Sequence, residues 1–226
     1  MTGRSGGLFI TIEGPEGAGK TTQARLLHDH LRRSYDVLYT REPGGTPIGE
    51  VVRRLVLDER HREMSPQAEM LLYAASRAQH VAEVIEPALR AGRLVLSERY
   101  VDTSFAYQGH ARGLGIGVVR AVNAVATRGI MPDLTILLDI EPAVGLERAR
   151  RTPGKEGHGG RGDRMEQEGV AFFERARAGF LAIASEERDR VRVVDGNRPA
   201  EQVHREVAAL VDAFLSARGW RASSSS

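Results

Sequence analysis

The chain of 226 residues has no cysteine, and lysine accounts for only two of its 32 basic side chains, Lys20 and Lys155. Without cysteine the chain can form neither a disulfide framework nor a thiolate site. Its seven histidines are scattered, without the spacing of a metal site or of a Ser/His/Asp triad. The chemistry is therefore to be sought among arginines, carboxylates and glycine-rich loops.

Long apolar stretches are also missing. No apolar run approaches the roughly 18 residues that cross a membrane, and residues 1–7 lack the apolar stretch of a signal peptide. The net charge is only +2 and no basic stripe is evident, so neither nucleic acid nor a membrane is an expected partner. With an ordinary apolar content of 41%, the composition favours a globular, cytoplasmic enzyme.

Short β-rich runs alternate with longer segments of helical periodicity. This alternation predicts an α/β fold with a parallel sheet flanked by helices, and ligands at the carboxyl ends of the strands. The expected strands are residues 8–12, 37–40, 94–97, 134–138 and 191–194. The expected helices are residues 20–33, 48–57, 66–90, 117–128, 142–151, 168–186 and 200–217. We predict a single domain over residues 8–220, with disordered ends at residues 1–7 and 221–226.

The most specific motif is Gly14-Pro15-Glu16-Gly17-Ala18-Gly19-Lys20-Thr21, which fits G-x-x-x-x-G-K-[ST] between an expected strand and an expected helix. Such glycines let backbone N–H groups wrap phosphate oxygens, and the helix N-terminus attracts the anion. Lys20 supplies a compact charge to the outer phosphates, and the Thr21 hydroxyl can ligate Mg²⁺. The motif and the adjoining Thr22 predict a nucleoside triphosphate site, to which we assign ATP.

The motif does not identify the reaction, because two other classes of P-loop protein also carry it. A GTP-dependent switch protein carries an Asn/Thr-Lys-x-Asp motif, but Lys155 lies in Gly154-Lys155-Glu156-Gly157 and cannot supply it. A nucleic-acid translocase would be longer and would carry a basic stripe. A nucleotide kinase therefore fits the chain best.

Three further segments place basic, aromatic and polar side chains where an acceptor could bind. Arg41 follows the second expected strand and precedes a Pro-Gly-Gly turn. Tyr73 and Arg77 lie four residues apart on one face of an expected helix and could hold a base and a phosphate. Residues 97–109 begin where the third expected strand ends. Taken singly, each segment would also fit a surface arginine, a core aromatic or a polar turn.

Together these segments resemble, in the same order, the motifs of bacterial thymidylate kinases. The P-loop, the Arg41 segment, the Tyr73–Arg77 helix and residues 99–108 carry the resemblance, as do Met131-Pro132-Asp133-Leu134-Thr135 and Asp163-Arg164-Met165-Glu166. The resemblance implies the P-loop nucleoside monophosphate kinase fold, with a five-stranded parallel sheet and a mobile lid. It also implies a homodimer and Mg²⁺-dependent transfer of the ATP γ-phosphoryl group to dTMP. Another nucleoside monophosphate kinase is the nearest alternative.

By this resemblance, Arg41, Arg77 and Arg99 surround the dTMP phosphate. Arg99 is also a candidate catalytic residue, together with Lys20 of the P-loop. Glu98 stands where aspartate is common and joins Thr21 as a candidate metal ligand. Since the acceptor phosphate is already anionic, positioning and charge stabilisation are expected to dominate catalysis.

The resemblance also assigns the base and the sugar of dTMP. Tyr73, at a position where phenylalanine is common, stacks on thymine. Ser104 and Gln108 lie near the pyrimidine edge. Tyr107 disfavours a ribose 2′-OH, and Glu16 lies near the 3′-OH.

The lid is expected at about residues 150–164 and is richer in glycine than in many relatives. The P-loop has no arginine, so the resemblance implies that the lid supplies the cation that stabilises the transferred phosphoryl group. The candidates are Arg150, Arg151, Arg161 and Arg164, although Arg164 could instead be structural beside Asp163. The resemblance further implies a cis peptide bond between Glu42 and Pro43.

Overall fold

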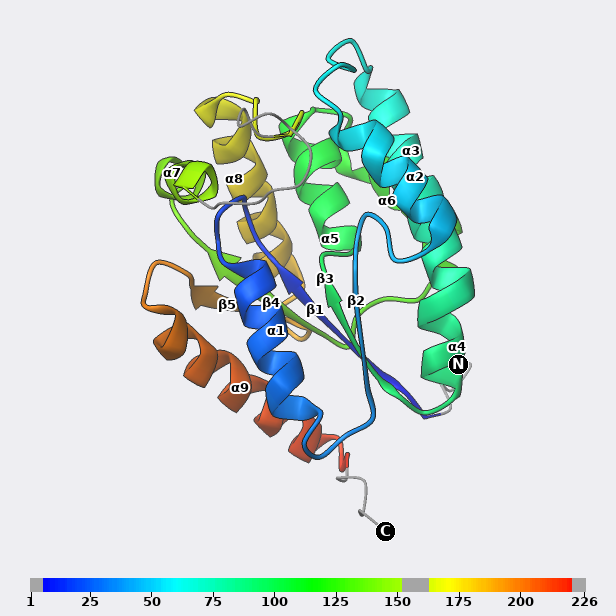
Figure 1. The fold of residues 1–226 in the computed structure, drawn as a ribbon, viewed down its shortest axis with the longest axis vertical. Helices are drawn as coiled ribbons and strands as arrows, with labels where there is room; N and C mark the ends of the chain where they lie inside the picture. The colour runs from blue at the N-terminus through cyan, green and yellow to red at the C-terminus, as the bar shows by residue number, and fades with distance from the viewer. Residues whose placement is uncertain (1–5, 152–162, 221–226) are drawn as a thin grey trace.

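The computed structural model describes residues 6–151 and 163–220, and a five-stranded parallel sheet forms its centre (Figure 1). The strands are β1 (Leu8–Glu13), β2 (Val37–Arg41), β3 (Leu94–Glu98), β4 (Leu134–Asp139) and β5 (Val191–Asp195). Their order across the sheet is β2-β3-β1-β4-β5, and every pair is parallel. All carboxyl ends therefore lie at one edge, and the chain progresses in opposite directions on the two sides of β1. This switch point is where open α/β sheets bind ligands.

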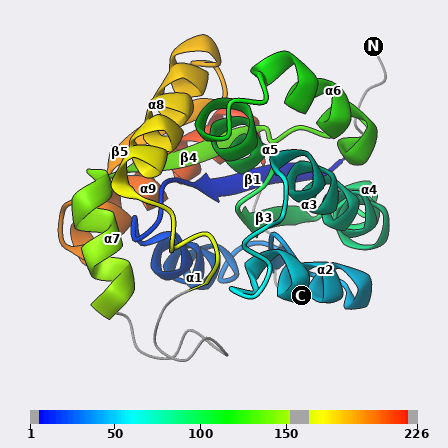
Figure 2. The ribbon, with the colours of Figure 1, turned by 90° about the horizontal axis from the view of Figure 1, so that it is seen from above.

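Helices cover both faces of the sheet, as Figure 2 shows from above. The long helices are α1 (Lys20–Leu31), α2 (Pro47–Leu57), α3 (Pro66–His80), α6 (Ile116–Thr127), α7 (Pro142–Arg151), α8 (Val170–Glu186) and α9 (Ala200–Ala217). Helices α1 and α9 pack together on one face, whereas α3 and α8 lie on the other. The predicted α/β fold, with a five-stranded parallel sheet flanked by helices, is confirmed.

Alternation along β1 explains why the sheet has a core on each face. Leu8, Ile10 and Ile12 belong to the cluster under α1 and α9, whereas Phe9 belongs to the cluster under α8. Glu13 points to the same face of the sheet as Phe9 and is fully buried at the carboxyl end of the strand. The strand therefore carries a carboxylate to the edge where the P-loop begins.

Two helical segments differ from the sequence prediction. Residues 66–90 were predicted as one helix, but α3 continues through a π-helical turn, η1 (Val81–Ile85), into α4 (Glu86–Arg90). Pro87 has no N–H to donate to the preceding turn, which interrupts the α-helical hydrogen bonds there. The other difference is a helical path after β3, formed by α5 (Val101–Ser104) and the π-helical η2 (Phe105–Ala111), which was not predicted.

The predicted disordered ends and lid fall mainly on residues 1–5, 152–162 and 221–226, which lie outside the described residues. Gly6 and Gly7 are described, and Gly7 is buried so closely that a Cβ would lie 2.5 Å from the carbonyl oxygen of Leu89. Within residues 6–151 and 163–220, none of the helices combines the length and apolar character needed to cross a bilayer.

Candidate active site

The loop between β1 and α1 wraps a space at the carboxyl edge of the sheet. Gly14 and Gly17 adopt φ values of 145° and 72°, which side chains rarely tolerate. A Cβ on Gly17 would also lie 1.9 Å from the carbonyl oxygen of Gly145. Ala18 N donates to Pro15 O, and α1 begins at Lys20 with no acidic residue in its first turn. The predicted P-loop therefore has the backbone form that cradles phosphate.

Lys20 is buried at the start of α1. Its Nζ donates to Pro15 O at 2.6 Å, inside the same loop. Burial, and then the nearby Arg99 guanidinium, lower the pKa of Lys20 to about 8. The negative charge of a phosphate ligand would offset the positive charge of the buried ammonium. The loop therefore favours an anion beside Lys20.

Arg99 connects the P-loop to the helical path after β3. It adopts a left-handed φ of 63°, and its backbone N donates to Ile12 O at 2.9 Å. Its guanidinium donates to Glu16 Oε2 at 2.9 Å and to Gly14 O at 3.3 Å, both in the P-loop. The Arg99 guanidinium also lies over the Tyr107 ring, 5.7 Å from its centroid. The Arg99 guanidinium therefore contacts both the P-loop, which is predicted to bind ATP, and Tyr107, which is predicted to bind the phosphoryl acceptor.

Glu13 holds this segment in place, although sequence analysis did not single it out. Its carboxylate accepts from Tyr100 N at 2.7 Å and from the Thr103 hydroxyl at 2.6 Å. Burial, and then the neighbouring Asp102, raise the pKa of Glu13 to about 7. These bonds fix the backbone on the C-terminal side of Arg99 and so support its left-handed conformation.

The two predicted metal ligands lie together. Thr21 Oγ1 donates to Glu98 Oε1 at 2.6 Å, and Tyr39 OH approaches Glu98 Oε2 at 3.4 Å. Among the described residues, no cluster of three metal-ligating side chains occurs. A hydroxyl and a single carboxylate beside a phosphate loop suit Mg²⁺, which usually retains waters and takes other oxygens from the nucleotide.

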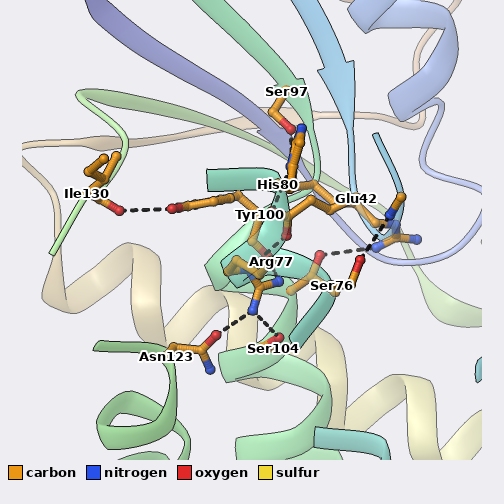
Figure 3. Close-up of polar contacts among 12 residues, drawn as sticks. Glu42, Ser76, Arg77, His80, Ser97, Tyr100, Ser104, Asn123 and Ile130 are labelled. Atoms are coloured by element: carbon orange, nitrogen blue, oxygen red, sulfur yellow. Dashed lines mark hydrogen bonds and ion pairs between the residues drawn. The ribbon is translucent and has the colours of Figure 1, made fainter. Parts of the chain in front are cut away.

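Arg77 and Tyr73 share one buried face of α3, and Arg77 is held by protein groups (Figure 3). Its guanidinium donates to Glu42 Oε2 at 2.7 Å and to Tyr100 O at 3.0 Å. It also donates to Ser104 Oγ at 2.9 Å and to Asn123 Oδ1. These bonds engage most of its N–H donors. The predicted contact of Arg77 with the dTMP phosphate stays a prediction and would have to use the one remaining donor, on Nη2.

Arg41 is the last residue of β2 and directly precedes the turn that follows this strand. It is about half exposed and pairs with Glu50 at 3.2 Å. The Glu42–Pro43 peptide bond is cis, as predicted. Arg53 of α2, which sequence analysis missed, donates to Pro43 O at 3.1 Å. Burial, and then the Arg41 guanidinium, lower the pKa of Arg53, which marks a site with positive charge to neutralise.

Tyr107 and Gln108 lie buried on η2, behind Arg99. The Tyr107 ring packs edge-on against Phe172 and Phe180, with centroid distances of 5.8 and 6.0 Å. Gln108 Oε1 is buried without a hydrogen-bond partner in the described part of the chain, whereas the Tyr107 hydroxyl interacts with the Arg99 guanidinium. A buried polar atom without a partner is uncommon in folded proteins and indicates a ligand position here.

The four candidate lid arginines have different surroundings. Arg150 is exposed, and Arg151 pairs with Glu147 at 2.5 Å on the surface of α7. Arg161 lies outside the described residues. Arg164 is buried and donates to Val56 O at 2.8 Å and to Glu69 Oε2 at 2.6 Å, which favours the structural alternative.

A cavity of about 300 Å³ adjoins the P-loop and the start of α1. Ala18, Gly19 and Thr22 line it, together with Arg148 of α7 and Arg198. Arg148 is braced by bonds of 2.9 Å to Gly196 O and Asn197 Oδ1. Neither Arg148 nor this cavity was predicted, because the residues that form it are separated by more than a hundred positions in the sequence.

The known proteins that are similar to this chain belong to one family. A family model described as thymidylate kinase matches residues 12–207. A thymidylate kinase of Deinococcus radiodurans is 50% identical over 208 residues, covering 92% of this chain and 97% of the relative. One of Roseiflexus sp. (strain RS-1) is 46% identical over 215 residues, covering 92% and 95%. A crystal structure of thymidylate kinase from Ehrlichia chaffeensis shares the fold with a TM-score of 0.73 and 30% identity, covering 92% of this chain and 99% of that one.

The family model spans most of the chain, and similar relatives match it along nearly their whole length. The solved thymidylate kinase structure shares the overall fold over nearly its whole length. This chain belongs to the thymidylate kinase family and is a phosphotransferase.

Proposed function

We propose that this protein transfers the γ-phosphoryl group of ATP to dTMP, giving dTDP and ADP. The position of Arg99 carries the proposal, because its guanidinium bonds to the P-loop and begins the segment that holds Tyr107 and Gln108. An acceptor phosphate near Arg99 would lie beside the donor phosphates in the P-loop. Arg41 and Arg53 supply further positive charge to that phosphate.

In the proposed reaction an anionic oxygen of the dTMP phosphate attacks the γ-phosphorus of ATP. A new P–O bond forms, the bond to the β,γ-bridging oxygen breaks, and ADP leaves with that electron pair. No general base is needed for an anionic nucleophile. Lys20 and Arg99 stabilise the charge on the phosphoryl oxygens, and a lid arginine among Arg150, Arg151 and Arg161 is proposed to add to it.

Thr21 and Glu98 are the residues that would hold Mg²⁺. When bound, Mg²⁺ neutralises charge on the donor phosphates. The hydrogen bond between the Thr21 hydroxyl and the Glu98 carboxylate keeps both oxygens within reach of a single ion.

The cavity beside Arg148 is proposed to receive the adenine of ATP. It adjoins the start of α1, so a triphosphate in the P-loop would extend its nucleoside toward the cavity. The Arg148 guanidinium, held by the 196–197 turn, is braced to stack on a planar base.

We also propose that two copies of the chain form a homodimer. The neighbouring helices α2, α3 and α6 expose large apolar side chains, namely Val51, Leu71 and Val125. Such exposure on adjoining helices suits a buried interface. The single domain over residues 8–220, its lid and the cytoplasmic location stay predictions.

A coupled ADP-release assay across dTMP, dUMP, dCMP, dAMP, dGMP and UMP tests the choice of acceptor. The expected result is that dTMP is turned over best and that activity requires Mg²⁺. The proposal would be wrong if dTMP were inert while another monophosphate was turned over well.

Tyr107 is proposed to exclude ribonucleotides by its bulk. Changing Tyr107 to alanine is expected to reduce the preference for dTMP over ribo-TMP by about tenfold or more, since one filled pocket position discriminates by about 10–200-fold. Tyr107→Phe is the matched control and should keep the preference, because it retains the ring. The alanine variant loses core packing worth about 3–5 kcal/mol, so its folded state must be verified by circular dichroism. An unchanged preference in a folded Tyr107→Ala protein would show that another residue excludes ribonucleotides.

A further inference from the structure

Glu69 is a fully buried carboxylate on α3, one helical turn before Tyr73. It accepts a hydrogen bond from Gln108 Nε2 at 2.8 Å and from Arg164 Nη2 at 2.6 Å. Arg112 donates to it through Nη2 at 2.9 Å and Nε at 3.2 Å. Burial opposes the charge of Glu69, but the bonds from Arg112 and Gln108 hold its pKa below the ordinary value. The group is therefore an ionised carboxylate, which only accepts hydrogen bonds.

This carboxylate determines how the Gln108 amide is turned. An amide can present either its NH₂ or its carbonyl group at a given place, and hydrogen-bond partners decide between them. Facing Glu69, only the NH₂ group is tolerated, because the carbonyl oxygen would be repelled by the carboxylate. Gln108 Oε1 therefore points away from Glu69 as a fixed acceptor.

In the described part of the chain, no N–H or O–H group donates a hydrogen bond to Gln108 Oε1. Gln108 is 1% exposed, and its Oε1 has no hydrogen-bond partner in the described ranges, residues 6–151 and 163–220. Leaving a buried carbonyl unpaired is unfavourable. A ligand that donates a hydrogen bond at this place would relieve that cost.

The edges of the pyrimidine bases differ at the atom that would face this acceptor. N3 of thymine and uracil carries a hydrogen and donates, whereas N3 of cytosine accepts. A carbonyl oxygen facing N3 pairs with the first and opposes the second. If the amide were free to turn, its NH₂ group could face N3 of cytosine instead.

We propose that Glu69 is a positioning residue that sets base specificity, because it locks Gln108 with its carbonyl oxygen toward the N3–H of a 4-oxopyrimidine. The proposal rests on dTMP as the acceptor and goes further by assigning the discrimination to a residue beyond contact with the base. Glu69 acts through Gln108, so its removal should change the choice of substrate more than the rate of transfer.

The direct test is Glu69→Gln, which keeps the shape of the side chain and removes the charge. The altered side chain offers an oxygen or an NH₂ group, so Gln108 is no longer locked. We expect the ratio of kcat/KM for dTMP to that for dCMP to fall by about 10–100-fold, as for a mismatched buried polar partner. The KM for ATP should stay near that of the unaltered protein.

Arg112→Lys is the matched control. It replaces the two N–H donors of Arg112 that bind Glu69 and alters the packing of that side chain on Phe172, but it keeps a cation beside Glu69 and leaves the Glu69–Gln108 contact. It should lower stability and keep the dTMP/dCMP ratio. If Arg112→Lys lowers that ratio as much as Glu69→Gln does, general loosening of the site explains the effect and the proposal is wrong.

The unaltered protein provides a test that does not depend on a variant folding. 3-Methyl-dTMP lacks the N3–H and is expected to have a kcat/KM about 10–100-fold below that of dTMP. Equal use of the two would overturn the proposed contact. If dTMP itself were not turned over, the proposed function would fail. If dTMP were used selectively and folded Glu69→Gln kept the full ratio, only the role of Glu69 would fail.

Discussion

Replacing Lys20 with methionine is expected to lower kcat by about 10²–10³-fold or more, the usual effect of removing one preorganised charge from a reacting oxygen. Lys20 begins α1 directly after the glycine loop and is buried within it. No other lysine lies in the described residues, since Lys155 falls in the range 152–162. Steady-state kinetics with saturating ATP and dTMP measure the effect. A variant with near-normal kcat would remove Lys20 from the reaction.

The same substitution is expected to stabilise the nucleotide-free protein. Because burial lowers the pKa of Lys20 from 10.5 to about 8, the charged form is disfavoured in the folded state. The free-energy cost of burying the charged Lys20 is complete below pH 8, where the side chain is protonated in both the folded and the unfolded chain. The cost disappears as the pH rises to 10.5, where the unfolded chain also loses its proton. At pH 7 the free energy of unfolding of Lys20→Met should exceed that of the unaltered protein by about 1–3 kcal/mol.

Urea unfolding at pH 7 and at pH 10, without nucleotide, measures this difference. The difference should shrink at the higher pH. Added ATP should reverse the order of stability, because the phosphates stabilise the protein that has Lys20 more strongly than the variant without it. Equal stability at pH 7, or a difference that grows toward pH 10, would contradict the account of the P-loop charge.

At least one lid arginine, changed to alanine, is expected to lower kcat by more than tenfold while dTMP binding stays nearly intact. Arginines that reach a transferred phosphoryl group can be worth about 10³–10⁵ in turnover. Arg151 and Arg161 are the first candidates, and Arg150 the next. Arg164 is expected to affect stability instead, because its loss would leave the buried Glu69 with fewer partners.

Single-turnover kinetics separate the transfer step from binding, and equilibrium titration with dTMP checks the acceptor site. Glu147→Ala is the matched control for Arg151, since it removes the surface ion pair and keeps the arginine. If all four single variants and the Arg151/Arg161 double variant kept near-normal kcat, the lid would not be the source of the catalytic charge.

Local patterns made much of the fold predictable. All five strands were found because short β-rich runs alternate with segments of helical periodicity, and each differs from the structure by only one residue at its end. Residues 101–111 were harder, because the π-helical turn of η2 departs from the 3.6-residue period. The break after His80 was missed for a similar reason, although Pro87 was a signal for it.

The candidate site was predictable where a motif or a resemblance named its residues. Thr21 and Glu98 share a hydrogen bond and Lys20 lies buried within the P-loop, while the roles of all three stay predictions. Glu69 was missed, although it precedes Tyr73 by one helical turn, as Tyr73 precedes Arg77. That spacing could have indicated a third residue on the same face. Its partner Gln108 belongs to another segment, and only the tertiary fold brings the two together.

Transfer of the γ-phosphoryl group of ATP to the phosphate of dTMP can be followed directly. The most direct measurement is ³¹P NMR of purified protein with ATP, dTMP and Mg²⁺, which identifies every phosphorus product in one sample. We expect dTDP and ADP to appear in equal amounts, with no matching release of inorganic phosphate. ADP and inorganic phosphate without dTDP, or no change at all, would contradict the proposed transfer.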